Sequence, residues 1–259
     1  SERAKATLME RVPLVRSGTA WPLRLDADGG LAQFLARLEP LVGPMQGWDI
    51  QGQLRLTAYG TVSSQYLSLR QTQAAIQNLR VRGSNWNIED SQVQLALQGT
   101  WRNAVRRAEI ASLSLIGTTL TVDSKNAVLD LPAFQAPQFS GDLTVSGDLA
   151  RLRAWHPSLA SAKIAGTVNG SARVTQTGLQ RKYDLQAQWK NAAASGTDWQ
   201  WSEPSVAATL QGRYDEPSDA FQIDVVNVDS RSLRLQGQGV IDSLKERPLL
   251  EMTGSVDYV

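Results

Sequence analysis

Two carboxylate groups that lie close to tryptophans are the residues best suited to do chemistry in this chain. Glu89-Asp90 follows Trp86, and Glu203 follows Trp199 and Trp201. Paired carboxylates cleave glycosidic bonds in many glycosidases, and tryptophan rings stack on sugars. Carboxylates beside turns also accept hydrogen bonds from the turn backbone, which is their commoner role. We therefore expect these residues to cap turns, with a carbohydrate-acting site as the minor alternative.

Histidine and cysteine, the other common catalytic and metal-binding residues, are almost absent. His156 is the only histidine and there is no cysteine, so ligands for a bound metal are scarce. His156 stands at the end of a predicted helix, where we expect it to be exposed, and its counterpart in the first repeat is Glu39. We find no nucleophile elbow, phosphate-binding loop or dinucleotide fingerprint. The sequence predicts a protein that is not an enzyme and that holds no cofactor and no metal.

The composition is that of a folded, nearly neutral protein. Of 259 residues, 42% are hydrophobic and 20% charged, with 26 basic against 25 acidic side chains. A net charge of +1 gives no electrostatic reason to expect binding to nucleic acid. The absence of cysteine fits an oxidising compartment without excluding the cytosol. No apolar run of about 18 residues is present, so we expect any signal or membrane anchor to lie outside this sequence.

The chain repeats itself at a constant spacing. Trp86 recurs as Trp199 and Gly99 as Gly212, each 113 residues later (199 − 86 and 212 − 99). Leu120-Thr-Val122 recurs as Leu233-Arg-Leu235 at the same spacing (233 − 120). Duplicated units stack on one another to bury faces that a single unit leaves exposed. Function is therefore expected along a continuous surface rather than in one pocket.

Apolar and polar residues alternate along most of the chain, which is the period-two pattern of strands with one buried face. Gln, Thr, Ser and Arg occupy the intervening positions, as in an antiparallel sheet with one face in water. Short segments rich in Gly, Asn, Asp and Ser separate the strands and suit tight turns. The pattern predicts a mainly β protein, a repeated antiparallel meander.

Two segments have helical spacing instead. Leu31, Phe34, Leu35 and Leu38 form an apolar stripe that predicts a helix near 29–39, with Asp28 as its cap and Pro40 as its end. Leu149, Leu152 and Trp155 predict a shorter helix near 148–156. Each helix follows a lead-in strand, and at two or three turns we expect each to cover one end of the sheet.

These patterns divide the chain into a lead-in segment and repeats. Residues 1–19 form a lead-in or the end of a preceding unit. The first β repeat covers 20–136 and the second 137–248, and the proline-containing segment 132–137 marks their junction. Residues 249–259 look like the start of a truncated third repeat.

The order of short motifs resembles a known family. A short helix with the sequence Asp148-Leu-Ala-Arg-Leu152 precedes strands that contain Leu-Gln-Gly, as in Leu210-Gln-Gly212 and Leu235-Gln-Gly-Gln-Gly239. This arrangement resembles the AsmA-like superfamily of Gram-negative envelope proteins (the AsmA, TamB and YhdP type). The likeness covers most of the chain, although each motif alone is degenerate.

The resemblance implies a periplasmic segment of a protein anchored in the inner membrane. Such proteins fold as a curled, open groove, the β-taco, and are thought to conduct phospholipid passively between the inner and outer membranes or to serve outer-membrane assembly. The implied partners are phospholipid or another acyl-chain ligand, the inner membrane, and envelope proteins that the sequence does not identify. The candidate lipid-groove residues are Leu54, Leu56, Leu67, Leu69, Leu79, Val81, Val93, Leu95, Leu97, Leu113, Leu115, Val206, Leu210, Ile223, Val225, Leu233 and Leu235.

Two alternatives stay open at this point. A closed sandwich or barrel core has the same alternation as an open groove, and periodicity does not reveal which side of each strand faces inward. The eight tryptophans could stack on sugars, but the recurrence of Trp86 as Trp199 favours packing. The second functional hypothesis is a structural or adhesive β-repeat module that binds a protein or a polysaccharide.

Overall fold

The computed structural model of the chain is mainly β, as the alternation predicted. It describes residues 3–9, 20–42, 47–83, 86–131, 138–156, 163–177, 179–196, 198–244 and 248–258, with the side chains of 38–42 and 177 left out. The described strands form one 14-stranded sheet in which the strand order is the order of the sequence. The observed pairs are antiparallel, so the sheet is a meander, and it is not closed because β1 and β14 form its two edges.

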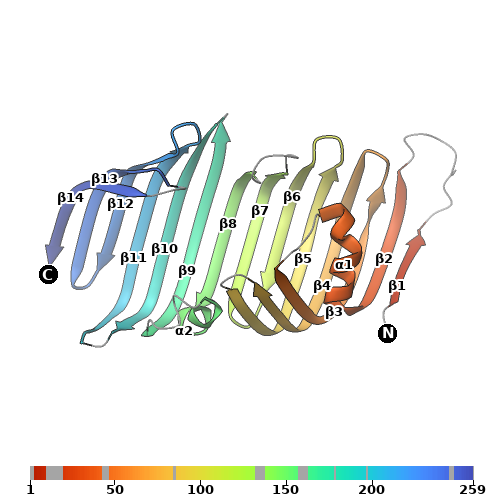
Figure 1. Cartoon of the computed structure of the whole chain (residues 1–259), viewed down its shortest axis with the longest axis horizontal. Coiled ribbons are helices and arrows are strands. Elements are labelled where there is room, and N and C mark those ends of the chain that lie inside the picture. The colour runs from red at the N-terminus through yellow and green to blue at the C-terminus, as the bar shows by residue number, and fades with distance from the viewer. Residues whose placement is uncertain are drawn as a thin grey trace. The chain divides into compact units, whose positions relative to one another are not determined.

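The chain divides into two compact units. The first consists of Ser1–Gln138 with Arg151–Ser161, and the second of Phe139–Ala150 with Ala162–Val259. The strands in the first unit are β1 (Arg3–Leu8), β2 (Trp21–Gly30), β3 (Trp48–Val62), β4 (Tyr66–Gly83), β5 (Trp86–Arg102), β6 (Arg107–Ile116) and β7 (Leu120–Asp130). Figure 1 shows them in chain order from red to yellow-green.

The strands of the second unit repeat this series. They are β8 (Gln138–Asp148, whose first residue belongs to the first unit), β9 (Lys163–Thr177), β10 (Gln180–Ser195), β11 (Gln200–Asp215), β12 (Ala220–Ser230), β13 (Leu233–Asp242) and β14 (Leu249–Tyr258). β5, β6 and β7 correspond to β11, β12 and β13 at the spacing of 113 residues. The irregularities recur as well, because the register shifts at Gln98/Gly99 and again at Gln211/Gly212. The internal repeat is therefore structural.

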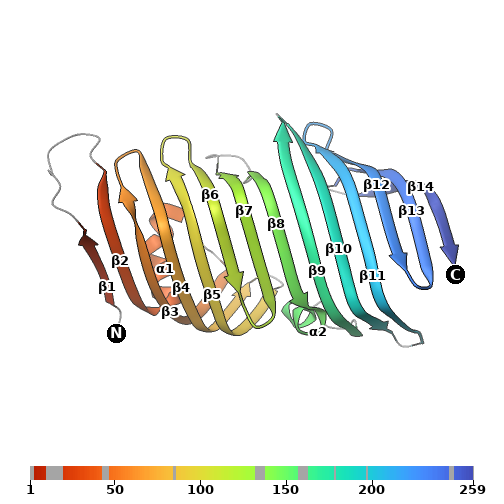
Figure 2. The same cartoon turned by 180° about the vertical axis from the view of Figure 1, so that it is seen from behind.

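Helix α1 (Leu31–Val42) follows β2 directly and lies across one face of the sheet at β2 and β3 (Figures 1 and 2). Leu31 is buried and Phe34 and Leu35 are half-buried, so these three residues of the predicted stripe pack on the sheet, and the side chain of the fourth, Leu38, lies outside the described part. Two details of the prediction were wrong. Asp28 lies within β2, where its carboxylate accepts a hydrogen bond from Arg55 Nε of β3. Pro40 does not end the helix, which runs to Val42, because the fixed φ of proline, about −65°, is compatible with a helical backbone.

The second predicted helix is much shorter than the first. α2 (Leu149–Leu152) makes a single turn, and the 3-10 turn η1 (Arg153–Trp155) continues it. The Asp148 carboxylate accepts a hydrogen bond from the Ala150 backbone N–H and so caps α2. η1 belongs to the first unit, where it contacts β5. The two repeats therefore differ most at their helical segments.

Candidate functional site

The largest shared feature of the first unit is a face of the sheet lined by apolar side chains. Residues directly opposite each other on antiparallel strands project from the same face. One row crosses β2 to β7 through Ala27, Leu56, Ala74, Leu95, Leu115 and Val122. The next row contains Leu25, Ala58, Thr72, Leu97, Leu113 and Ser124. The register thus places hydrophobic side chains side by side over six strands.

The candidate residues of the first repeat all lie on this face. They are Leu54, Leu56, Leu67, Leu69, Leu79, Val81, Val93, Leu95, Leu97, Leu113 and Leu115. In β4 the alternation of apolar and polar residues is interrupted twice. The register shifts between Leu69 and Thr72, and Asn78 has a φ of 53°. A bulge adds one residue to a strand and returns the following side chains to the required face. We call this set, with its row neighbours, the apolar face of the first unit.

The apolar face is only partly covered. Five of the nine buried apolar residues among those described are alanines, namely Ala27, Ala58, Ala74, Ala127 and Ala192. Alanine is short enough to be buried by taller neighbours in a single layer, whereas the tips of leucines need a second layer to cover them. Leu25 is 38% exposed, and the other leucines of the two rows are half-buried. Across the described residues, the segments that pack on the strands of this unit are α1 and η1.

The second unit has an equivalent apolar face built from smaller residues. One row consists of Leu143, Ala172, Leu185, Leu210, Val226, Gly237 and Gly254. Its neighbour consists of Val145, Gly170, Ala187, Ala208, Val228, Leu235 and Val256. Val206, Leu210, Ile223, Leu233 and Leu235, which the alternation singled out, lie on this face.

Val225 does not lie on this face. It pairs with Gln211, whereas Leu210 pairs with Val226, because the register shifts at this point in β12. The neighbouring Asp224 accepts a hydrogen bond from Arg213 Nη2 on the polar side. A single bulge therefore reverses the alternation, and Val226 takes the place that the period-two pattern assigned to Val225.

Sequence reasoning also missed several members of the apolar face. These are small residues, such as Ala74 and Gly170, or residues that follow a bulge, such as Ile76 and Val228. Small side chains give a weak hydrophobic signal. Two recurrences in the sequence coincide with irregularities of the strands: Gly99 recurs as Gly212, and Asn78 recurs as Asn191 (191 − 78 = 113), both asparagines having a positive φ.

The opposite face of the first unit is polar and crossed by ion pairs. Arg24 Nε donates to Asp26 Oδ2 over 2.8 Å, and Arg102 Nε donates to Glu109 Oε1 over 2.9 Å. These hydrogen bonds lower the pKa of Asp26 and of Glu109 below their ordinary values. Both pairs are solvent-accessible, so each contributes little to stability. The two faces of the sheet thus differ clearly in polarity.

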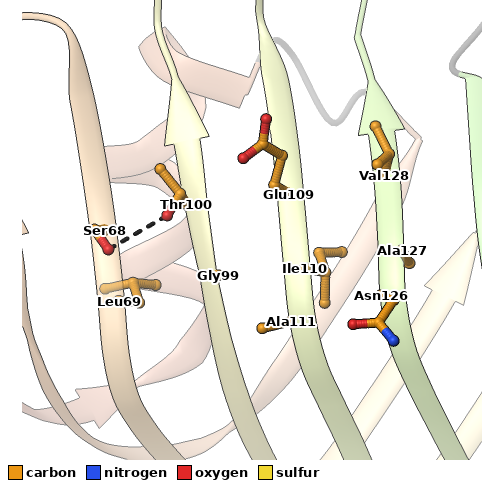
Figure 3. A pocket seen from close by; sticks show the side chains of 10 residues that line it. All are labelled: Ser68, Leu69, Gly99, Thr100, Glu109, Ile110, Ala111, Asn126, Ala127 and Val128. Atoms are coloured by element: carbon orange, nitrogen blue, oxygen red, sulfur yellow. Dashed lines mark hydrogen bonds between the residues drawn. The ribbon is translucent and has the colours of Figure 1, made fainter.

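A hollow of about 410 Å³ forms where bulges interrupt β4, β5, β6 and β7 (Figure 3). Ser68, Thr100, Glu109 and Asn126 supply its polar groups, and Thr100 Oγ1 donates to Ser68 Oγ over 3.3 Å. The Glu109 carboxylate is already paired with Arg102. Leu69, Ile110 and Val128 are among its apolar lining residues, so the hollow has mixed polarity, and its residues form no acid–base pair.

The carboxylates near the tryptophans support hairpins, as expected. Asp90 is 6% exposed and accepts hydrogen bonds from Thr118 N (2.9 Å), Thr118 Oγ1 (3.0 Å) and Thr119 N (3.3 Å). It thereby holds the β6–β7 turn against β5. Glu203 is the equivalent residue of the second unit (203 − 90 = 113), is 5% exposed, and accepts from Ser232 Oγ of the β12–β13 turn. Asp90 uses both carboxylate oxygens on the turn, whereas Glu203 binds its turn through Oε1, and its buried Oε2 has no hydrogen-bond partner among the described residues.

The tryptophans differ in their surroundings. Trp86 is 45% exposed and meets the ring of His156 edge to face, with ring centroids 4.9 Å apart. His156 is half-buried against this ring, in contrast to the exposed position expected for it. Trp189 packs on Trp201 at 5.5 Å, whereas Trp199 is 58% exposed. Packing therefore explains some of the tryptophans, and others present open ring surface.

Two further searches of the structure gave negative results. Among the residues that the structure describes, no three His, Asp or Glu side chains come together in a way that could hold a metal ion. Within the same part of the chain, no helix has both the length and the apolar character needed to cross a membrane. The apolar faces are thus the main candidate for function.

No family model, curated protein or solved structure matches this chain.

Proposed function

We propose that the apolar face of each unit carries the hydrocarbon chains of lipids, and that the chain is a non-enzymatic periplasmic segment of an AsmA-like protein. In this proposal it is a passive conduit for phospholipid between the inner and outer membranes, or a part of outer-membrane assembly. The observation that carries the proposal is the partly exposed apolar face of the first unit, on which Leu56, Leu95 and Leu115 share a row.

The hydrophobic effect supplies the driving force. Fully burying a leucine or valine side chain contributes about 1.5–3 kcal/mol, so a face of half-exposed leucines gains stability when something apolar covers it. Acyl chains provide that cover without directional bonds. The Gln, Ser and Arg side chains of the other face keep that side in water.

Passive movement follows from the arrangement of the rows. Strands are spaced about 4.8 Å apart, so a row of apolar side chains offers an acyl chain nearly identical contacts at each strand. A chain that slides by one strand exchanges one set of contacts for a similar set. Movement along such a groove needs no energy source at this segment, and head groups remain in solvent at the open side.

The remaining parts of the proposal come from the resemblance of the motifs. The AsmA-like pattern places the segment in the periplasm and joins it to the inner membrane through an anchor elsewhere in the protein. A curled, open groove is the geometry we propose for the two apolar faces. Helix α1 then covers part of the groove at β2 and β3.

Lipid extraction from the purified protein tests this proposal. Native mass spectrometry should detect bound phospholipid, and chromatography of the organic extract should identify it. The variant Leu95→Asp places a carboxylate on the apolar face, where transfer of an aspartate into hydrocarbon costs about 2.5–3.5 kcal/mol, so bound lipid should fall more than tenfold. The matched control is Ala96→Asp, since Ala96 is exposed on the opposite face of the same strand.

Each result has a clear meaning. Loss of lipid in Leu95→Asp, retention in Ala96→Asp and equal circular dichroism of the two variants would support a lipid-carrying face. Equal lipid binding by wild type and a folded Leu95→Asp would contradict it. Leu210→Asp makes the same test in the second unit, because Leu210 lies in a row of that apolar face.

The exposed tryptophans favour a second function, a structural or adhesive module that binds a polysaccharide or a protein. Trp48, Trp86 and Trp199 are all exposed, and open indole rings stack on sugars. A glycan array separates the two functions. Glycan binding that is lost in Trp86→Ala or Trp199→Ala, together with a lipid-free protein, would replace the conduit with this alternative.

A further inference from the structure

Strand β14 is the most exposed strand of the second unit. All of its side chains are exposed, including Val256 at 64% and Tyr258 at 83%. One edge of β14 pairs with β13, and no strand in the described part of the chain pairs with the other edge. A free edge presents unpaired N–H and C=O groups that can accept another strand.

The sequence of β14 repeats that of β8. Leu143-Thr-Val-Ser-Gly-Asp148 in β8 corresponds to Met252-Thr-Gly-Ser-Val-Asp257 in β14, with Thr, Ser and Asp at identical spacing. In β8, one edge of this segment is occupied by β9, with Leu143 opposite Ala172 and Val145 opposite Gly170. The two strands therefore share a sequence pattern, but within the described part of the chain β8 has a β9-type neighbour and β14 has none.

An exposed ion pair joins β8 and β9. Arg173 Nε of β9 lies 2.6 Å from Asp142 Oδ1 of β8. Asp142 immediately precedes Leu143, and Glu251 immediately precedes Met252, so Glu251 holds the equivalent position in β14. Among the described residues, no cation pairs with Glu251. Glu251 on β14 is thus an acidic group at the position where Asp142 of β8 forms an ion pair with Arg173 of β9.

We propose that the free edge of β14 is a docking site for an antiparallel strand of the β9 type, supplied by a further repeat unit. The docking strand carries small or apolar residues at alternate positions and a basic residue opposite Glu251. Its pairing places Gly254 opposite a position equivalent to Gly170 and extends the apolar face by one strand. This docking rests on backbone pairing and charge, and is independent of whether the face carries lipid.

A synthetic peptide with the sequence of residues 163–177 tests the docking site. Fluorescence anisotropy of the labelled peptide should show saturable binding to the full chain, and hydrogen exchange should slow at the backbone amides of β14. A peptide of the same composition in shuffled order should not bind. A peptide with Gly170→Pro should also fail, because proline removes a ladder donor and disfavours pairing on both sides.

A charge exchange tests the register. Glu251→Arg should weaken binding of the peptide about two- to fivefold, which is the scale of an exposed ion pair, and Arg173→Glu in the peptide should restore it. Asp257→Arg is the matched control. Asp257 is equivalent to Asp148, which lies opposite Thr167, so in the proposed pairing it faces an uncharged residue of the peptide. Arg173→Glu in the peptide should therefore not restore any binding that Asp257→Arg loses.

Three results of the peptide experiments would overturn the proposal. These are absence of saturable binding to a folded protein, equal affinity for the shuffled peptide, and a charge reversal without rescue. Sedimentation velocity provides a fourth, since protection of β14 that arises only from self-association of the chain would show that its edge pairs with its own copy instead.

Discussion

Loss of the Asp90 carboxylate should destabilise the first unit substantially. Asp90 accepts hydrogen bonds from the backbone and hydroxyl of Thr118, from Thr119 N and from Gln92 N at 3.0 Å. In Asp90→Ala these donors lose their acceptor, and Thr119 is itself buried at 6% exposure. A buried donor left unpaired costs about 1–3 kcal/mol, and hydrogen bonds to charged groups contribute about 1.5–3 kcal/mol each.

The donors that reach water recover part of this loss, so we expect the free energy of unfolding to fall by about 2–4 kcal/mol. In Asp90→Asn the free energy of unfolding should fall by about half as much, since the amide keeps one oxygen acceptor. Ser91→Ala is the matched control, because Ser91 is the exposed neighbour and surface substitutions usually change stability by less than about 0.5 kcal/mol.

Urea unfolding followed by tryptophan fluorescence measures these differences, with one transition fitted for each unit. Hydrogen exchange of the 117–119 turn provides a local readout, which should accelerate in Asp90→Ala. If the free energies of unfolding of Asp90→Ala and Ser91→Ala differ by less than about 0.5 kcal/mol, the carboxylate does not hold the turn and our interpretation of its hydrogen bonds is wrong.

Two further predictions concern the bulged region of the first unit. A Cβ at Gly99 would approach the backbone oxygen of Glu109 to 2.6 Å, so Gly99→Ala should lower the free energy of unfolding in urea by about 1–3 kcal/mol. The control Gly30→Ala should lower it much less, because a Cβ there meets only the flexible Gln33 side chain, at 3.4 Å. Equal losses in the two variants would contradict the close approach at Gly99. The Arg102 hydrogen bond lowers the folded-state pKa of Glu109 below its ordinary 4.5, so the pair stabilises the fold above that pH and this contribution is lost as the pH falls further through the lowered value. Urea titrations between pH 7 and pH 3 should therefore show a shallower acid dependence in Glu109→Gln, and an unchanged dependence would show that the pair is not maintained in solution.

The strands and the repeat were predictable because both are local or linear properties of the sequence. Alternation in segments such as Val93, Leu95 and Leu97 identifies a strand without knowledge of its neighbours. The recurrence of Gly99 at Gly212 identified the repeat and, as the structure shows, the position of a bulge. The short second helix was overestimated because three apolar residues at helical spacing do not reveal where a helix ends.

The membership of the apolar face depends on pairing between strands. Val225 was assigned by period two, but a register shift between Ile223 and Val226 placed it on the polar side. Ala74 belongs to the face because its strand partners are Leu56 and Leu95, which no local pattern reveals. A one-residue bulge inverts every later side chain of a strand, so a face is a property of the whole register.

Periodicity and residue type were enough to predict the strands, the internal repeat and the absence of familiar catalytic motifs, because none of these depends on contacts between distant residues. The tertiary structure alone decided which side of each strand belongs to the apolar face and how far that face is covered. It also decided the role of Asp90, whose hydrogen-bond donors Thr118 and Thr119 lie 28 and 29 residues away in the sequence. Such contacts form only when the strands have paired, because pairing brings distant backbone and side-chain groups within hydrogen-bonding distance.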